Sequence, residues 1–245
     1  MISDNVYKEL IGALAMRGGA APALDCPELH ALLRELFDPE EAELASQMPV
    51  NAVSTADIAS STGRDVAEVE RLIDGMCNKG LVIGRPRGGV EVYSLLQILP
   101  GIFEYQFMKG EVSDRTRKLA RLFEDYQNVV YNLADQAVKQ GAKIEAFPFA
   151  RVIAVEQEIS AGTEVQPYDR VSEYIESADC IAVSQCYCRH HGELLGRACD
   201  KPKEVCLTFG PGAKFNVDRG FGRMISKEEA LRVLDLAEKE GLVHC

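Results

Sequence analysis

The sequence predicts an α+β fold that is mostly helical, in which an N-terminal winged helix-turn-helix precedes a small α/β domain rich in cysteine. Three observations predict it. Apolar residues recur at helical spacing through much of the first half of the chain. Two helix patterns and a hairpin pattern follow one another between Ser54 and Tyr93. Four of the eight cysteines gather between Ser184 and Gly210.

The composition is that of a globular protein. The chain has 245 residues, of which 47% are hydrophobic and 27% are charged, and this suits one large domain or two small ones. The net charge of -11 argues against non-specific binding to nucleic acid or to an anionic membrane. We recognise no signal peptide and no apolar run near the ~20 residues that a bilayer crossing needs. The sequence therefore predicts a cytoplasmic protein with no membrane partner, whose clustered cysteines bind metal or do redox work.

The first 50 residues predict three helices. Met1 to Met16 carries apolar residues at helical spacing, and Gly18-Gly19 ends this pattern. Two shorter helices are predicted over Pro27 to Phe37 and Pro39 to Met48, because Asp38-Pro39 divides them.

The next segment predicts the winged helix. Ser54 can cap a short helix, and Asp65 can cap a second helix that ends near Gly80. Two β-like runs then flank the turn residues between Arg85 and Gly89, which is a hairpin signal. Helix, turn, helix and hairpin in this order are typical of a winged helix.

The charge of this segment disfavours DNA as a partner. Ser54 to Tyr93 carries five basic and six acidic side chains, and its second helix is acid-rich. Contacts of basic side chains with phosphates dominate DNA affinity, and this segment can make few of them. We therefore favour a packing or docking module, while the wing residues Arg85 and Arg87 keep DNA binding open as the alternative.

The rest of the chain predicts one long helix and then mixed structure. The long helix covers Ser113 to Gln140 and is interpreted as a core or dimer helix that connects the two halves. Strands are predicted over Phe149 to Val155 and Cys180 to Ser184, with a short helix from Arg170 to Ser177 between them. A capping box at Ser226 to Glu229 begins the final helix.

The clustered cysteines are Cys186, Cys188, Cys199 and Cys206, with the spacing C-x-C-x10-C-x6-C. Structural zinc sites usually take cysteines in pairs two to four residues apart, which fits this spacing poorly. Iron–sulfur clusters accept four thiolates at more varied spacings. We therefore predict a [4Fe-4S] cluster held by these four thiols, with zinc as the alternative.

Basic residues accompany the cysteines. Between Cys180 and Arg223 the sequence holds seven basic and four acidic side chains, and positive charge near a cluster stabilises its reduced form. We expect four side chains to surround the cluster without binding it directly: Arg189, His190, His191 and Arg223. For the two histidines, direct ligation and simple exposure are the alternatives.

The other cysteines and the glycine-rich stretches are assigned structural roles. Cys26 and Cys77 are expected to be buried, Cys180 to be structural, and the role of Cys245 is left open. Gly210-Pro211-Gly212 is interpreted as a turn that does not stand between a strand and a helix, so no dinucleotide site is predicted. The predicted units are 1–50 (N-terminal helices), 51–95 (winged helix), 96–145 (connecting or dimer helices) and 146–245 (cluster-binding domain).

Several stretches resemble one family. They extend over nearly the whole chain and include "EVERLIDGMCNKGLV", "LPGIFEYQF", "VQPYDRVSEYIESADCIAVSQCYCR", "RACDKPKEVCLTFGPGA" and "GFGRMISKEEALRVLDLAEKEGLVH". On these residues the chain resembles bacterial and archaeal 4Fe-4S ferredoxin-type proteins with an N-terminal winged helix. The resemblance implies cluster binding by the four cysteines and electron transfer. Longer members continue into C-x-x-C-x-x-C ferredoxin repeats, so we expect either a short member with one cluster or a truncated chain.

The first functional hypothesis is a cytoplasmic protein that passes single electrons to or from a partner redox protein, with the winged helix as a docking or homodimer module. The second is a winged-helix transcription regulator that senses an iron–sulfur cluster. The third is an enzyme whose cluster keeps one iron open to substrate, which needs a three-cysteine site beside a pocket. The fourth is a structural zinc protein.

Overall fold

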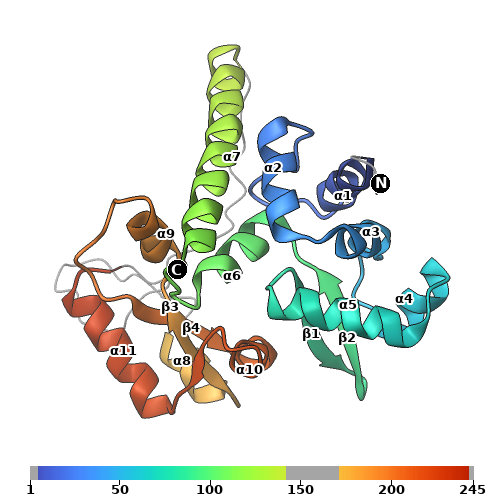
Figure 1. Ribbon diagram of the computed structural model, residues 1–245. Helices are drawn as coiled ribbons and strands as arrows, with labels where there is room; N and C mark the ends of the chain where they lie inside the picture. Colours follow the sequence, from blue (N-terminus) through green and yellow to red (C-terminus); the bar gives the residue numbers. More distant parts are fainter. Residues whose placement is uncertain (1–4, 142–170, 243–245) are drawn as a thin grey trace.

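The computed structural model describes residues 5–141 and 171–242. Its fold is α+β and mostly helical, with 59% helix and two small sheets, as predicted. Figure 1 shows the N-terminal elements on one side of a long central helix and the C-terminal elements on the other. The first group comprises α1 (Asn5–Ala15), α2 (Pro27–Leu36), α3 (Pro39–Gln47), α4 (Thr55–Thr62), α5 (Val66–Asn78), β1 (Val82–Arg87) and β2 (Val90–Leu95).

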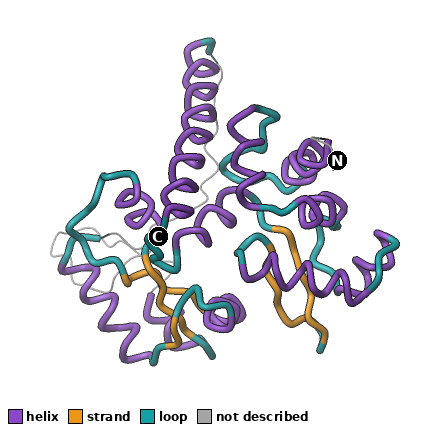
Figure 2. The backbone as a smooth tube through the Cα atoms, viewed as in Figure 1, coloured by secondary structure: helices purple, strands orange, loops and turns teal. Residues whose placement is uncertain are grey.

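The remaining elements build the centre and the C-terminal half. An irregular turn over Ile98–Ile102 leads into α6 (Phe103–Phe107), and α7 (Asp114–Lys139) follows it. The C-terminal half comprises α8 (Val171–Ser177), β3 (Ile181–Gln185), α9 (Tyr187–Leu194), β4 (Glu204–Phe209), α10 (Gly210–Asp218), β5 (Arg223–Met224) and α11 (Lys227–Lys239). Figure 2 shows the strands as two separate sheets, one in each half.

The predicted caps begin the helices where the sequence places them. The Ser54 hydroxyl accepts the N–H of Asp57 at 3.2 Å, and the Asp65 carboxylate accepts the N–H of Ala67 at 2.9 Å. Each cap satisfies a backbone donor that the first helical turn leaves unpaired, which stabilises a helix by about 1 kcal/mol. Helices α4 and α5 therefore begin at the predicted positions.

The hairpin β1–β2 is closed by a two-residue turn. The strands are antiparallel with Arg87 opposite Val90, so Gly88 and Gly89 alone connect them. Both glycines have positive φ, 61° and 83°, which is the backbone conformation that both central residues of a two-residue type I′ hairpin turn require. An isolated bridge between Val53 and Tyr93 ties the start of α4 to the hairpin.

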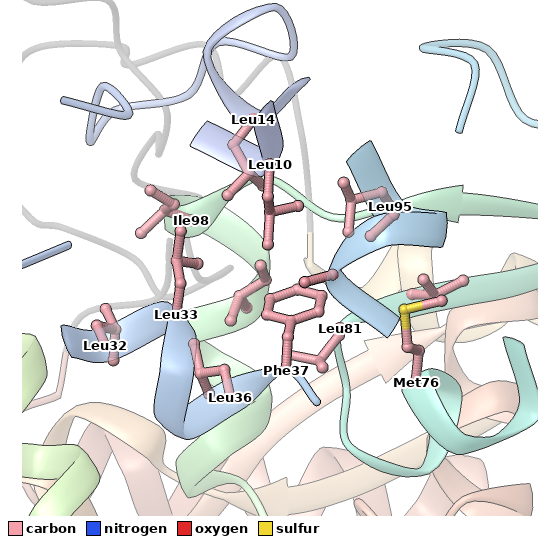
Figure 3. Packing of buried hydrophobic residues seen from close by; sticks show 14 of the residues in the cluster. Leu10, Leu14, Leu32, Leu33, Leu36, Phe37, Met76, Leu81, Leu95 and Ile98 are labelled. Atoms are coloured by element: carbon pink, nitrogen blue, oxygen red, sulfur yellow. The ribbon is translucent and has the colours of Figure 1, made fainter. Parts of the chain in front are cut away.

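One large apolar cluster joins the two halves. Figure 3 shows side chains from several N-terminal elements gathered around Phe37. Leu10 and Leu33 are two of them. The same cluster includes Phe215 of α10 and Phe221, which belong to the C-terminal half. Because the apolar side chains of both halves are buried together, burial stabilises the contact between the halves as well as each half.

A second, smaller cluster lies under the C-terminal sheet. The strand order is β4-β3-β5, and both pairings are antiparallel. Ile181 and Val183 of β3 pack with Ile225 and Ala230. Since side chains alternate along a strand, Ala182 and Ser184 lie on the opposite face, toward α10. The sheet is therefore covered on both faces.

The long helix α7 is a core helix in its first half. Ser113 caps it, and Leu119, Phe123 and Tyr126 are buried. Its second half extends beyond the neighbouring helices (Figure 1), and Tyr131 is 66% exposed there. The core role that we predicted is thus confirmed for the first half, while the dimer role stays a prediction.

Other predictions meet the structure with different results. Within the described residues, the short helix begins at Val171, and the predicted β3 is present. The strand predicted over Phe149 to Val155 lies outside the described residues, as does Cys245. The interpretation of Gly210-Pro211-Gly212 is wrong, because β4 ends at Phe209 and α10 begins at Gly210. The sheet is antiparallel, however, so this is no βαβ dinucleotide unit.

Candidate metal centre

Three of the four predicted ligands come together where β3 passes into α9. Cys186 is the N-cap of α9, Cys188 lies in the first turn of that helix, and Cys206 lies on β4. The N–H of Cys186 donates to the carbonyl oxygen of Lys203 at 2.6 Å, which fixes the end of β3 against β4. Ser184 is the direct partner of Cys206 in the β3–β4 ladder, and the thiol of Cys186, just beyond the end of β3, is in hydrogen-bonding contact with that of Cys206.

The three thiols interact with one another. Hydrogen bonding with Cys188 and then with Cys206 lowers the pKa of Cys186. The pKa values of Cys188 and Cys206 are raised, mainly by hydrogen bonding with Cys186 and secondly by burial. Of the three thiols, Cys186 is therefore the one whose deprotonation the arrangement favours, and thiolate is the form that binds metals.

The environment of Cys199 differs from that of these three. Cys199 is exposed in the loop between α9 and β4. Within residues 5–141 and 171–242, no group of three or more His, Cys, Asp or Glu side chains is arranged to hold a metal ion. The structure thus shows three neighbouring potential ligands and a fourth on an adjacent loop, not an assembled metal site.

Two residues near the thiols were not predicted from the sequence. The ring of Tyr187 packs edge-on against Phe103, with 5.9 Å between ring centroids, and burial raises the pKa of its hydroxyl. Glu104 of α6 accepts the N–H of Gly101 at 2.5 Å, and burial raises the pKa of its carboxyl. The charge of Glu104 also acts on Cys188. The approach of α6 to α9 creates this neighbourhood, and no spacing in the sequence indicates it.

The two histidines anchor α9 to the central part of the chain, at the start of α7 and just before it. Nε2 of His190 donates to the carbonyl oxygen of Glu111 at 2.9 Å, and Nε2 of His191 donates to that of Ala120 at 3.1 Å. Burial lowers the pKa of His191. The alternative of simple exposure is wrong, because the two residues are only 2% and 6% exposed. They fix the helix that carries Cys188.

The two arginines expected around the site have different positions. Arg189 donates to the carbonyl oxygen of Pro202 at 3.0 Å, and its charge helps to lower the pKa of Cys186. Arg223 forms a two-pronged hydrogen bond with Glu204 at 3.0 Å and an ion pair with Glu229 at 2.7 Å. Arg189 therefore acts on a thiol, whereas two carboxylates engage Arg223.

The predicted excess of positive charge is largely offset in three dimensions. Several basic side chains of the segment from Cys180 to Arg223 pair with carboxylates that lie outside it. These pairs are Arg197 with Glu124, Lys201 with Glu240, Arg219 with Asp74, and Arg223 with Glu229. Counting charges along the segment therefore overstates the positive field at the thiols.

Two buried polar atoms near Cys206 have no hydrogen-bond partner among the described residues. They are Oγ of Ser184 and Oδ1 of Asn216, whose residues are 2% and 1% exposed. An unpaired buried polar group costs about 1–3 kcal/mol. Together with the soft thiol donors, these unpaired atoms fit a site whose bound group supplies the missing interactions.

Two clefts lie between the halves, away from the thiols. The larger, about 430 Å³, separates the β1–β2 hairpin from α10, and its lining includes Tyr93 and Lys214. The smaller, about 230 Å³, lies beside α5 and includes Asp74 and Arg219. Neither lining contains one of the four cysteines, so neither is the pocket that the open-site enzyme hypothesis requires.

No protein-family model, curated protein or solved structure matches this chain. The resemblance stated from the sequence therefore stays a prediction. In the ranges that the structure describes, no helix combines the length and the apolar character needed to cross a membrane.

Proposed function

We propose that this protein binds a [4Fe-4S] cluster through Cys186, Cys188, Cys199 and Cys206 and transfers single electrons to or from a partner redox protein. The observation that supports the proposal is the convergence of three thiols at the start of α9. Thiolates are the usual ligands of iron–sulfur clusters and also suit zinc. A bound cluster would supply a one-electron redox centre.

The surrounding residues would hold the ligands in place. The N-terminus of α9 presents backbone N–H groups and the positive end of the helix dipole to the thiolates of Cys186 and Cys188. His190 and His191 fix the opposite side of α9 to backbone carbonyls. Cys199 would complete the ligand set from its exposed loop.

The N-terminal half would serve as a packing or docking module. Helices α4 and α5 and the β1–β2 hairpin follow one another in the order of a winged helix. The exposed side of α5 carries Glu70 and Asp74, and Arg219 of α10 binds Asp74. An acidic helix held by the other half is poorly suited to reading DNA, which disfavours the regulator hypothesis.

Metal and sulfide analysis tests the proposal. The protein is purified anaerobically, iron, acid-labile sulfide and zinc are counted per chain, and the absorption spectrum is recorded before and after dithionite. We expect about four irons and four sulfides, with a broad band near ~400 nm that dithionite bleaches. One zinc ion per chain without sulfide would overturn the electron-transfer proposal and support a structural zinc protein.

A further inference from the structure

Ser184 lies directly across the β3–β4 ladder from Cys206. Directly opposed residues in an antiparallel pair place their side chains on the same face, with Cβ atoms about 4.5–5.5 Å apart. The Ser184 hydroxyl is buried and has no partner among the described residues. A hydroxyl is a hydrogen-bond donor, so an unused donor lies beside a predicted ligand thiol.

Asn216 brings a second buried polar side chain to the same face of the sheet. Its Nδ2 lies 3.1 Å from Oγ1 of Thr208, while its Oδ1 has no partner in the described part of the chain. Thr208 is two residues beyond Cys206 on β4, so both side chains lie on the face toward α10. The oxygen and nitrogen of an amide are assigned from their hydrogen bonds. In the reversed orientation Oδ1 accepts from Thr208, and the NH₂ becomes the unused donor.

The backbone beside Ser184 leaves room for its hydroxyl. A Cβ at Gly222 would lie 2.5 Å from Oγ of Ser184 and 2.8 Å from the carbonyl oxygen of Val183. The N–H groups of Phe221 and Gly222 bond to the carbonyl oxygen of Asn216 at 2.7 Å and 3.2 Å. The same tight turn therefore fixes the backbone of Asn216 and accommodates the hydroxyl of Ser184.

We infer that Ser184 and Asn216 are hydrogen-bond donors kept for the sulfur of Cys206 in the metal-bound protein. The inference rests on the proposed function. A thiol becomes a thiolate when it binds a metal, and a thiolate is a much better acceptor than a thiol. Donors to a ligand sulfur withdraw negative charge from the centre and raise its reduction potential. Both residues are thus positioning residues for Cys206.

Substitution of Ser184 separates this role from a purely structural one. In Ser184→Ala we expect the cluster content of the wild type, a midpoint potential shifted to lower values, and a melting temperature of the metal-free protein that is unchanged or higher. The melting temperature is not expected to fall, because the variant removes a buried hydroxyl that has no partner. Asn216→Ala should also lower the potential. Ser177→Ala is the control, since Ser177 is exposed and its hydroxyl bonds to Tyr174.

The outcomes distinguish this inference from the proposed function. A wild-type potential in Ser184→Ala with full cluster content overturns the inference alone. A lower melting temperature of the metal-free variant also overturns it, because the hydroxyl then bonds to the protein or to a buried water. If the wild type holds no cluster, Co²⁺ is the probe. A Ser184→Ala shift in the sulfur-to-cobalt absorption band supports the inference although the proposed function fails, and an unshifted or absent band overturns both.

Discussion

Arg219 and Asp74 join the two halves of the chain by an ion pair across 145 residues of sequence. Arg219 is the C-cap residue of α10. Its guanidinium also donates to Oδ1 of Asn78 at 2.8 Å. Both acceptors lie on α5. A single side chain at the end of α10 therefore holds α5, the second helix of the predicted winged helix.

Loss of this ion pair should weaken the whole fold modestly. In Arg219→Ala we expect the free energy of unfolding to fall by about 1 kcal/mol, because the Asp74 side chain is largely exposed and solvent screens the pair. Urea unfolding of wild type and variant measures the difference. Arg117→Ala, at an exposed position of α7, should change stability by less than ~0.5 kcal/mol. Equal losses in both variants would contradict the joining role.

Cys199 decides whether the ligand set has three or four members. We expect Cys188→Ser to abolish or destabilise cluster binding, and Cys199→Ser to lower the iron content although Cys199 is exposed. Cys77→Ser is the control, because Cys77 is fully buried and burial raises its pKa to about 12. Iron and sulfide analysis of each variant gives the answer. Wild-type iron in Cys199→Ser would reduce the ligand set to three cysteines.

Stability should fall in mildly acidic solution because of His191. Burial holds the pKa of His191 below its ordinary value of 6.5, so the unfolded chain binds this proton more readily than the folded chain. The free energy of unfolding then decreases as the pH falls below about 6.5 toward the folded pKa. Melting temperatures at pH 7.5, 6.5 and 5.5 measure this slope (about 6.5 being the unfolded midpoint). His191→Gln keeps a donor for the carbonyl oxygen of Ala120 and should reduce this dependence of the melting temperature on pH. An unchanged dependence would show that another titrating group causes it.

Two glycines should respond oppositely to alanine. Gly222→Ala forces a Cβ against the Val183 carbonyl and should destabilise the protein by about 1–3 kcal/mol. Gly12 lies inside α1 with open space around its Cα, so Gly12→Ala should stabilise by about 0.5–1 kcal/mol. Urea unfolding of the two variants tests the pair. An unchanged free energy of unfolding in Gly222→Ala would show that the turn adjusts to the added Cβ without strain.

Local chemistry made much of the fold predictable. Ser54 and Asp65 cap their helices through atoms two or three residues away, so the sequence alone locates both starts. Gly88-Gly89 between two β-like runs likewise favours a tight turn, because glycine adopts positive φ without strain. Strand β4 was missed although Val205, Leu207 and Phe209 alternate with more polar residues, because the segment was considered only for its ligand Cys206. Helix α10 was missed because its opening Gly-Pro-Gly suggests a turn.

The candidate site was less predictable because its neighbours come from distant segments. The two-residue spacing of Cys186 and Cys188 makes them neighbours in any fold, but the approach of Cys206 depends on the β3–β4 register. The burial of His190 and His191 depends on how α9 packs against α6 and α7. Offsetting charges such as that of Glu124 come from outside the segment, so composition could not reveal them.

The anchoring of α9 has a consequence for the modularity of the chain. His191 bonds to Ala120, and its ring packs against Phe103 and Phe107, with 5.1 Å and 5.0 Å between ring centroids. All three partners lie on the central helices α6 and α7, outside the C-terminal half. The cysteine-bearing segment therefore cannot be transferred to another protein on its own, because it would lose the helices that orient its thiols.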